Sequence, residues 1–225
     1  MLHMAIDKIV PSVDEALADI GQGATLLVSG FGEAGAPSAL LEVLSGRRLR
    51  DLTIVSNNAG SGGAGLAALI GSGAVRKLIC SFPKGPDSEV FANLYASKRI
   101  ELELVPQGTL SERIRAAGAG IGGFYTRTGA DTELGLGKER RTIDGQDYVL
   151  EWPLYGDYAL VRAAAADRWG NLVYNKTARN YGPTMATAAR TTIVEVAKVV
   201  PLGELDPEVI VTPGIFVDRV VEVRT

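Results

Sequence analysis

Residues 24–37 decide the fold, and they read ATLLVSGFGEAGAP. The first five, from Ala24 to Val28, are almost all apolar and too few for a typical helix, so they predict a buried strand. The glycine-rich segment 29–35 predicts a tight loop, because glycine adopts backbone angles that other residues avoid. A helix pattern over 38–45 comes next. The stretch therefore predicts a strand, a loop and a helix, which together form the repeating unit of an α/β protein.

This alternation continues through the first half of the chain. Two capping boxes, at 12–15 and 109–112, predict the starts of two helices, the first ending near residue 20. Because the strands are largely apolar, we expect an open, mostly parallel sheet with helices on both of its faces. The other elements expected here are strands over 52–55, 75–80 and 101–105 and helices over 66–70 and 87–96.

The second half of the chain has a different pattern. Residues 118–137 carry seven glycines and little periodicity, which predicts a long loop whose role the sequence leaves open. The pair Asp144-Gly145 favours a hairpin turn between 141–143 and 146–150. Without a linker or a repeat, we expect residues 1–225 to form one domain with a small antiparallel lobe. The remaining elements expected are a hairpin of strands 158–164 and 172–174, a helix over 183–189 and strands over 192–196 and 209–212.

Composition excludes several classes of protein. The 225 residues are 46% hydrophobic, and their 27 glycines follow no G-X-Y period, which excludes collagen. The net charge of −3 gives no basis for binding nucleic acid or an anionic membrane. One histidine, His3, and one cysteine, Cys80, exclude a Cys/His metal site and the Ser-His and Cys-His triads. With no apolar run near the roughly 20 residues of a membrane span, and no signal peptide in 1–8, we expect a cytoplasmic protein.

The glycine loop matches the G-x-G-x-x-G pattern of dinucleotide-binding folds from Gly30 to Gly35. That fingerprint also needs an acidic residue at the end of the second strand, where this chain has Ser56-Asn57-Asn58. The mismatch disfavours a dinucleotide. Two interpretations stay open: a tight turn without a ligand, and a backbone surface that a ligand or partner approaches closely.

Four loops follow the four strands of the first half, at 29–35, 56–60, 81–85 and 106–108. In an open parallel sheet they emerge at the carboxyl edge, where ligands bind. They bring together Asn57, Asn58, Gln107 and glycines, which can stabilise an oxyanion or orient a carboxylate. No base or nucleophile accompanies them. The sequence therefore predicts half of an active site.

At these residues the chain resembles the alpha subunits of the family I coenzyme A transferases. Residues 29–37, SGFGEAGAP, match the signature G-G-F-x-x-x-G-x-P except at Ser29, and the resemblance extends over about residues 5–222. Further matching blocks are VSNNAG (55–60), PQGTLSERIR (106–115), residues 117–125, DRWGN (167–171) and ARN (178–180).

The resemblance implies a mechanism and a partner. In this family a glutamate of the beta subunit, in a Ser-Glu-Asn-Gly context, attacks the acyl-CoA and becomes a glutamyl-CoA thioester, from which the acceptor acid takes the CoA. This sequence has no such tetrapeptide. An α2β2 assembly is implied, with the CoA thioester as substrate and with no separate cofactor and no metal.

The resemblance also implies roles for residues of this chain. Gln107 would donate to the oxyanion or the substrate carbonyl. The residues implied to bind substrate are Asn57, Asn58, Gly30, Phe31, Gly32 and Gly35. From the residues alone, Gln107 can instead fix a turn, and the asparagines can form Asx turns. Arg179 and Asn180 are expected to reach the site or the partner, whereas Glu33 as a local nucleophile is disfavoured.

Substrate choice has three interpretations. Blocks 80–83, 87–88, 203–207 and 212–216 most resemble transferases that move CoA from succinyl-CoA to 3-oxoadipate. Transferases that use another 3-oxo acid (acetoacetate) or acetate are the first alternative. The second is a different class, a non-catalytic module that binds a small molecule at the same sheet edge.

Overall fold

The structure of the protein is a computed structural model that describes residues 6–85 and 87–223; His3 lies outside them. In the first half the elements are α1 (Val13–Ala16), β1 (Thr25–Val28), α2 (Ser38–Ser45), β2 (Leu52–Asn58), α3 (Gly65–Gly71), β3 (Val75–Phe82), α4 (Glu89–Ala96), β4 (Glu101–Leu104) and α5 (Gln107–Gly118). In the second half they are β5 (Phe124–Thr126), η1 (Glu133–Gly135), β6 (Arg140–Ile143), β7 (Gln146–Glu151), β8 (Gly156–Ala166), β9 (Leu172–Val173), η2 (Lys176–Arg179), α6 (Gly182–Thr187), β10 (Ala189–Val199), η3 (Pro207–Val209), η4 (Gly214–Phe216) and β11 (Arg219–Glu222).

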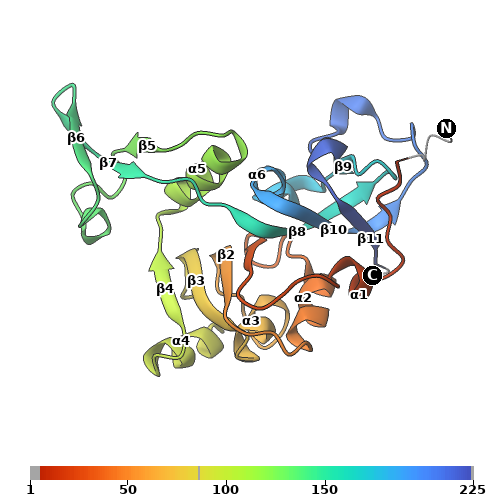
Figure 1. The fold of residues 1–225 in the computed structure, drawn as a ribbon, viewed down its shortest axis with the longest axis horizontal. Coiled ribbons are helices and arrows are strands. Elements are labelled where there is room, and N and C mark those ends of the chain that lie inside the picture. Colours follow the sequence, from red (N-terminus) through yellow and green to blue (C-terminus); the bar gives the residue numbers. More distant parts are fainter. Residues whose placement is uncertain (1–5, 86, 224–225) are drawn as a thin grey trace.

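Both halves of the chain build one main sheet of eight strands within the described residues. Its order is β11-β10-β8-β1-β2-β3-β4, all parallel, and β9 pairs antiparallel with β8. Figure 1 shows α2, α3 and α4 on one face of this sheet and α5 and α6 on the other. The expected open parallel sheet with helices on both faces is confirmed.

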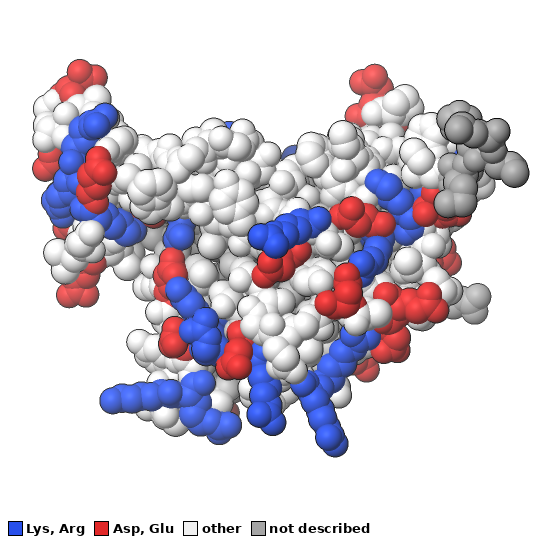
Figure 2. Space-filling model, in the orientation of Figure 1, with Lys and Arg blue, Asp and Glu red and all other residues white. Residues whose placement is uncertain are grey.

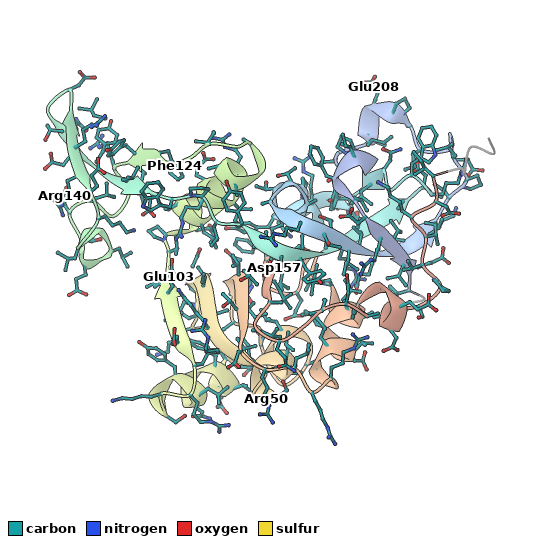
Figure 3. The ribbon with its side chains drawn as sticks, in the orientation of Figure 1. Arg50, Glu103, Phe124, Arg140, Asp157 and Glu208 are labelled. Atoms are coloured by element: carbon teal, nitrogen blue, oxygen red, sulfur yellow. The ribbon has the colours of Figure 1, made fainter. Side chains whose placement is uncertain are left out.

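The core lies on both faces of the sheet, because successive side chains of a strand point to opposite sides. On β1, Leu26 and Val28 belong to the cluster packed with α1 to α4, whereas Leu27 belongs to the cluster packed with α5 and α6. The halves join where the Thr25 amide donates to Asp157, at the start of β8 (2.9 Å; Figure 3). Burial on both faces explains why the strands read as continuous apolar runs.

The small antiparallel lobe expected from the sequence is confirmed. It consists of β5, β7 and β6, and projects from one end of the molecule (Figure 1). The Asp144-Gly145 hairpin is confirmed, since Ile143 pairs with Gln146. Residues 118–137 are not one continuous loop, because β5 pairs with β7 and η1 follows.

Three further expectations need correction. The β8–β9 hairpin exists, but β8 lies inside the main sheet, between β1 and β10. The strand expected over 209–212 is wrong: η3 ends at Val209, and Thr212 forms only an isolated bridge with Leu172. The capping box at Thr109 is also wrong, because Pro106 precedes the helix and α5 begins at Gln107.

The other capping box is confirmed, since the Ser12 hydroxyl accepts a hydrogen bond from the Glu15 amide (3.2 Å). Helix α1 nevertheless ends at Ala16, before the residue 20 expected from the sequence. None of the helices in the described ranges combines the length and the apolar character that crossing a bilayer needs. Charged side chains gather over the lobe and the lower part of the view in Figure 2, and a band between the lobe and the C-terminal part is mostly free of them.

Candidate active site

The glycine loop between β1 and α2 is held closed by its own first residue. The buried Ser29 hydroxyl donates to the Gly35 carbonyl (2.8 Å) and accepts from the Arg162 amide (3.2 Å). Within the loop the Phe31 amide donates to the Ala34 carbonyl (3.0 Å). Serine at the first signature position therefore closes the loop instead of disturbing it.

Asn180 fastens this loop to the second half of the chain. Its Oδ1 accepts from the amides of Gly30 (3.1 Å) and Tyr181 (2.7 Å). Its Nδ2 donates to the carbonyls of Ala34 (2.8 Å) and Thr177 (3.1 Å). The sequence predicted that Asn180 reaches the site or the partner, and the structure places it on the loop.

Two glycines of the loop have a structural reason to be glycine. At Gly30, φ is +127° and a Cβ would lie 3.2 Å from the Cα of Ala36. At Gly35, φ is +75° and a Cβ would overlap the carbonyl oxygen of Ala178, at the close contact between the loop and η2. Side chains are disfavoured at both positions by conformation and by space.

Gln107 and Asn57 meet at the carboxyl edge of the sheet, as their strand positions predict. The Gln107 Nε2 donates to Asn57 Oδ1 (2.7 Å). Asn57 ends the buried part of β2 and is 3% exposed, whereas Gln107 is exposed as the first residue of α5. An amide nitrogen carries two hydrogens, and the second has no partner within the described chain.

The N-terminus of α5 adds to this polarity. Its first backbone N–H groups have no partner inside the helix, and the helix dipole is positive there. Gly108 lies in this first turn, with no atom within 4 Å of where a Cβ would be. The turn expected after the fourth strand is therefore a helix start, and no side chain at Gly108 covers its amides.

Asn58 makes a local turn. Its Oδ1 accepts from the Gly60 amide (2.8 Å), which is the Asx-turn alternative considered from the sequence. The residue also lines a narrow cavity of about 20 Å³ with Gly30 and Gly32. Its oxygen already accepts one hydrogen bond in the turn, and its NH2 group has no partner in the described chain and can face a ligand.

Tyr181 is a site residue that the sequence analysis missed. It is buried, and its hydroxyl lies 3.4 Å from both Asn57 Oδ1 and the Gln107 carbonyl oxygen. Burial raises the pKa of the Tyr181 phenol, and the neighbouring Ser81 hydroxyl acts in the opposite direction. The signal in the sequence was its place directly after the ARN block.

Two hydroxyls at this edge of the sheet are buried without a partner in the described chain. Ser81 Oγ and Thr109 Oγ1 are both buried without a hydrogen bond of normal geometry in the part of the chain that the structure describes. Thr109 is in the first turn of α5 and Ser81 is near the end of β3. Unpartnered buried polar groups are uncommon and gather at functional sites.

A buried carboxylate fixes the helix that follows the glycine loop. Glu195 of β10 is 1% exposed and accepts from the Leu40 amide in the first turn of α2 (3.0 Å). Burial raises its pKa, while this amide and Arg162 (Nη1–Oε1 3.8 Å) act against the rise. The sequence analysis missed Glu195 because one acid in an apolar strand gives no pattern.

Two larger cavities flank the loop and share Phe31 and Asn180. One, of about 340 Å³, is lined by Phe31, Gln107, Gly108, Ser111, Asn180, Tyr181 and Thr184. The other, of about 580 Å³, is lined by Phe31, Ala34, Lys176, Thr177, Arg179 and Asn180. Phe31 is 53% exposed between them. The loop thus offers the approachable surface that its glycines predict.

The residues at this edge of the sheet supply hydrogen-bond donors. Neutral amides and a helix N-terminus stabilise negative charge that develops on a carbonyl oxygen. Cys80 lies nearby on β3, but burial raises its pKa to about 12, which leaves it an unreactive thiol. Glu33 is exposed on the loop.

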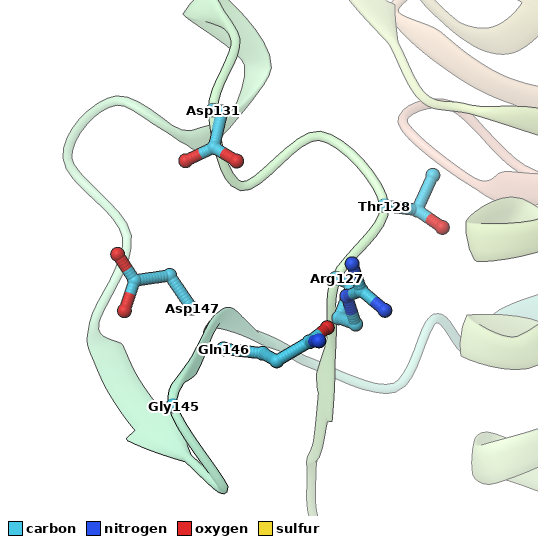
Figure 4. Close-up of a pocket in the computed structure, with 6 residues that line it drawn as sticks. All are labelled: Arg127, Thr128, Asp131, Gly145, Gln146 and Asp147. Atoms are coloured by element: carbon cyan, nitrogen blue, oxygen red, sulfur yellow. The ribbon is translucent and has the colours of Figure 1, made fainter.

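A cavity of about 550 Å³ in the lobe has a different character. Figure 4 shows its lining residues, which come from the segment after β5 and from the turn and strand of β6–β7. All of them are exposed, so no buried polar group points into it; they are Arg127, Thr128, Asp131, Gly145, Gln146 and Asp147. We assign no function to it.

The chain belongs to the coenzyme A transferase family, which it matches over residues 10–223. It is 58% identical to the alpha subunit of the 3-oxoadipate CoA-transferase of Pseudomonas putida, over 97% of this chain and 94% of that one. It is 46% identical to the corresponding subunit of a probable succinyl-CoA:3-ketoacid coenzyme A transferase of Bacillus subtilis, over 95% and 89%. The resemblance to the alpha subunits of this family is therefore confirmed.

A solved structure shows the same fold. The apoenzyme of an acyl-CoA transferase from Escherichia coli O157:H7 superposes with a TM-score of 0.86 at 23% identity, over 98% of this chain. The chain spans about half (48%) of the length of that transferase.

Proposed function

We propose that this chain is the alpha subunit of a CoA-transferase that moves CoA from succinyl-CoA to 3-oxoadipate. The observation that carries the proposal is the Gln107–Asn57 pair at the N-terminus of α5, beside a glycine loop and without a poised nucleophile. The 58% identity to the alpha subunit of a 3-oxoadipate CoA-transferase supports the choice of substrates. The partner is a beta subunit in an α2β2 assembly, and the enzyme works in the cytoplasm with the CoA thioester as substrate and no further cofactor.

The nucleophile in this proposal is a glutamate of the beta subunit. Its carboxylate attacks the thioester carbonyl of succinyl-CoA, the C–S bond breaks, and a mixed anhydride and CoA thiolate form. The thiolate attacks the glutamyl carbonyl, which releases succinate and leaves a glutamyl-CoA thioester. The acceptor carboxylate repeats the two steps in reverse and leaves as its CoA thioester.

Gln107 contributes to each of these steps through its free amide hydrogen. Every step passes through a tetrahedral centre whose oxygen becomes negative, and a fixed N–H donor stabilises that charge. Asn57 holds the amide in place, since its Oδ1 takes the other hydrogen. A carboxamide suits this role because it carries no charge that would compete with the attacking carboxylate. Gly30, Phe31, Gly32 and Gly35 give the thioester access to the backbone, with Asn58 beside them.

The test is reconstitution with the partner. This chain and its beta subunit, identified by the Ser-Glu-Asn-Gly tetrapeptide, are purified separately and together, and CoA transfer from succinyl-CoA is measured. We expect activity only in the mixture, with 3-oxoadipate as the preferred acceptor. Activity with neither 3-oxoadipate nor another acid would favour a non-catalytic binding module.

Acetoacetate is the second candidate acceptor. The 46% identity to a subunit of a succinyl-CoA:3-ketoacid transferase favours it. A kcat/KM for acetoacetate above that for 3-oxoadipate would make acetoacetate the preferred acceptor. The proposed roles of the site residues would stay the same.

A further inference from the structure

The turn η2 presents two cations beside the candidate active site. Lys176 and Arg179 are both exposed, and neither forms an ion pair with any residue in 6–85 or 87–223. Together with Phe31 and Ala34 they line the 580 Å³ cavity. The cavity therefore combines an aromatic wall with positive charge.

The position of these cations is fixed by the glycine loop. Asn180, next to Arg179, bonds Gly30 and Ala34 of the loop, and the contact of Gly35 with Ala178 leaves no room for a side chain. Lys176 holds a left-handed backbone angle (φ +50°), which residues other than glycine rarely adopt. Strained backbone of this kind gathers at functional sites. The turn is thus a fixed part of the site wall.

The 580 Å³ cavity lies next to the cavity that Gln107 lines. The two share Phe31 and Asn180, so a ligand that has one end at Gln107 can extend past the Phe31 ring towards Lys176 and Arg179. Methylene groups pack well on an aromatic ring, and a guanidinium binds a carboxylate through two parallel hydrogen bonds. The acid of the loop, Glu33, lines a different cavity with Arg162 and forms no ion pair with either cation in the described chain.

We propose that Lys176 and Arg179 bind the distal carboxylate of a dicarboxylic acceptor and make the enzyme prefer 3-oxo diacids to 3-oxo monoacids. This inference rests on the proposed function, because it places the reacting carboxyl group at Gln107. It assigns substrate choice to η2 and leaves the chemistry to the Gln107 edge.

The test uses the complex with the beta subunit and two acceptors of equal carbon number, 3-oxoadipate and 3-oxohexanoate. In the Lys176→Gln/Arg179→Gln double variant, KM for 3-oxoadipate should rise about tenfold or more, the effect of losing a charge-assisted hydrogen bond. At saturating succinyl-CoA, whose own distal carboxylate can bind the same cations, KM for 3-oxohexanoate and both kcat values should change less than about twofold. Arg50→Gln is the matched control, since Arg50 is an exposed cation remote from the carboxyl edge (Figure 3).

Two results would overturn the inference. One is an unchanged KM for 3-oxoadipate. The other is an equal rise in KM for both acceptors in the double variant that becomes smaller when 3′-dephospho-succinyl-CoA is the donor. The cations would then bind the CoA phosphates.

Binding of the unreactive diacid adipate separates this inference from the proposed function. If the wild-type complex transfers CoA to neither 3-oxoadipate nor 3-oxohexanoate, the proposed function fails. Calorimetry with adipate still tests whether Lys176 and Arg179 bind a carboxylate. Adipate binding that hexanoate does not reproduce, and that the double variant loses, supports the site. Absence of adipate binding to the wild type overturns it.

Discussion

The cavity that Gln107 and Tyr181 line is smaller than the lobe cavity, about 340 against 550 Å³, yet it is the one that borders the candidate active site. Around the loop, buried polar groups converge: Asn57, Tyr181 and the Ser29 hydroxyl are all shielded from solvent. Around the lobe cavity every lining residue is exposed. Convergence of buried polar groups therefore locates the site better than cavity volume does.

The two regions also differ in what holds them. The loop is held by neutral hydrogen bonds from Ser29 and Asn180. The junction of the lobe with α5 is held by charges that meet at Arg113 of α5, which lies 3.9 Å from Glu151 of the lobe strand β7. On the main-sheet side Arg113 pairs with Glu103 of β4 (2.8 Å), which also pairs with Lys77 of β3 (2.5 Å), and on the lobe side Glu151 pairs with Lys138. Neutral bonds around the loop leave the reacting end of the site without a charge that would compete with an attacking carboxylate, whereas the junction has only to hold two parts together.

Replacing one glutamine by alanine in each region tests the difference between them, and we expect the largest effect here. Gln107→Ala should lower kcat in the complex by roughly 10²–10³-fold, because one oxyanion donor is lost. Gln146→Ala, in the lobe cavity, should leave kcat unchanged. Steady-state kinetics of both variants with the beta subunit checks this, and a wild-type kcat for Gln107→Ala removes the residue from its role.

Two glycines, one in the loop and one in the lobe, provide the second comparison of the two regions. Gly35→Ala should reduce the free energy of unfolding by about 2–4 kcal/mol, since the left-handed angle and the overlap with Ala178 both oppose a side chain. Gly145→Ala, in the lobe hairpin, has a similar φ (+73°) but open space, so we expect a loss of only about 1 kcal/mol. Urea denaturation of both variants measures the difference, and equal losses would show that the contact with η2 is loose.

Two tyrosines, one in each region, test whether the buried hydroxyl beside Asn57 and Gln107 contributes to catalysis. Tyr181→Phe removes the hydroxyl beside Asn57 and Gln107, and a neutral hydrogen bond of this kind predicts a fall in kcat of roughly 2–10-fold with KM nearly unchanged. Tyr125→Phe is the control, because Tyr125 bonds only to Glu139 in the lobe among the described residues. A rise in KM without a change in kcat would instead place Tyr181 in substrate binding.

The smallest effect concerns pH and the lobe junction. Burial acts to raise the pKa of the Glu103 carboxyl, but hydrogen bonds from Arg113 and Lys77 outweigh it and hold the pKa below its usual value near 4.5. A lowered folded-state pKa stabilises the fold above pH 4.5, and this stabilisation is lost as pH falls through the folded-state value.

Glu103→Gln should therefore flatten the decline of unfolding free energy below pH 4.5. Glu101→Gln is the control, because its pair with Arg76 is exposed on both sides and contributes little. Identical acid profiles for wild type and Glu103→Gln would contradict a charge-dependent junction.

Local patterns and topology predicted much of the molecule. The apolar run of β1 and the Ser12 cap were visible in the sequence, and the parallel order brought Asn57 and Gln107 together although they are 50 residues apart. The place of β8 was not predictable, because a strand's neighbours are set by long-range pairing that its own residues do not encode. Tyr181 and Glu195 were hidden for the same reason, since each acts through a partner more than 70 residues away.

In the proposed enzyme this chain provides the hydrogen-bond donors and its partner provides the nucleophile. Intact-mass spectrometry of the complex, incubated with succinyl-CoA and no acceptor, tests it directly. We predict CoA covalently attached to the beta subunit, none on this chain, and none when this chain is incubated alone. A CoA adduct on this chain, or CoA transfer by this chain without its partner, would show that the nucleophile belongs to this chain.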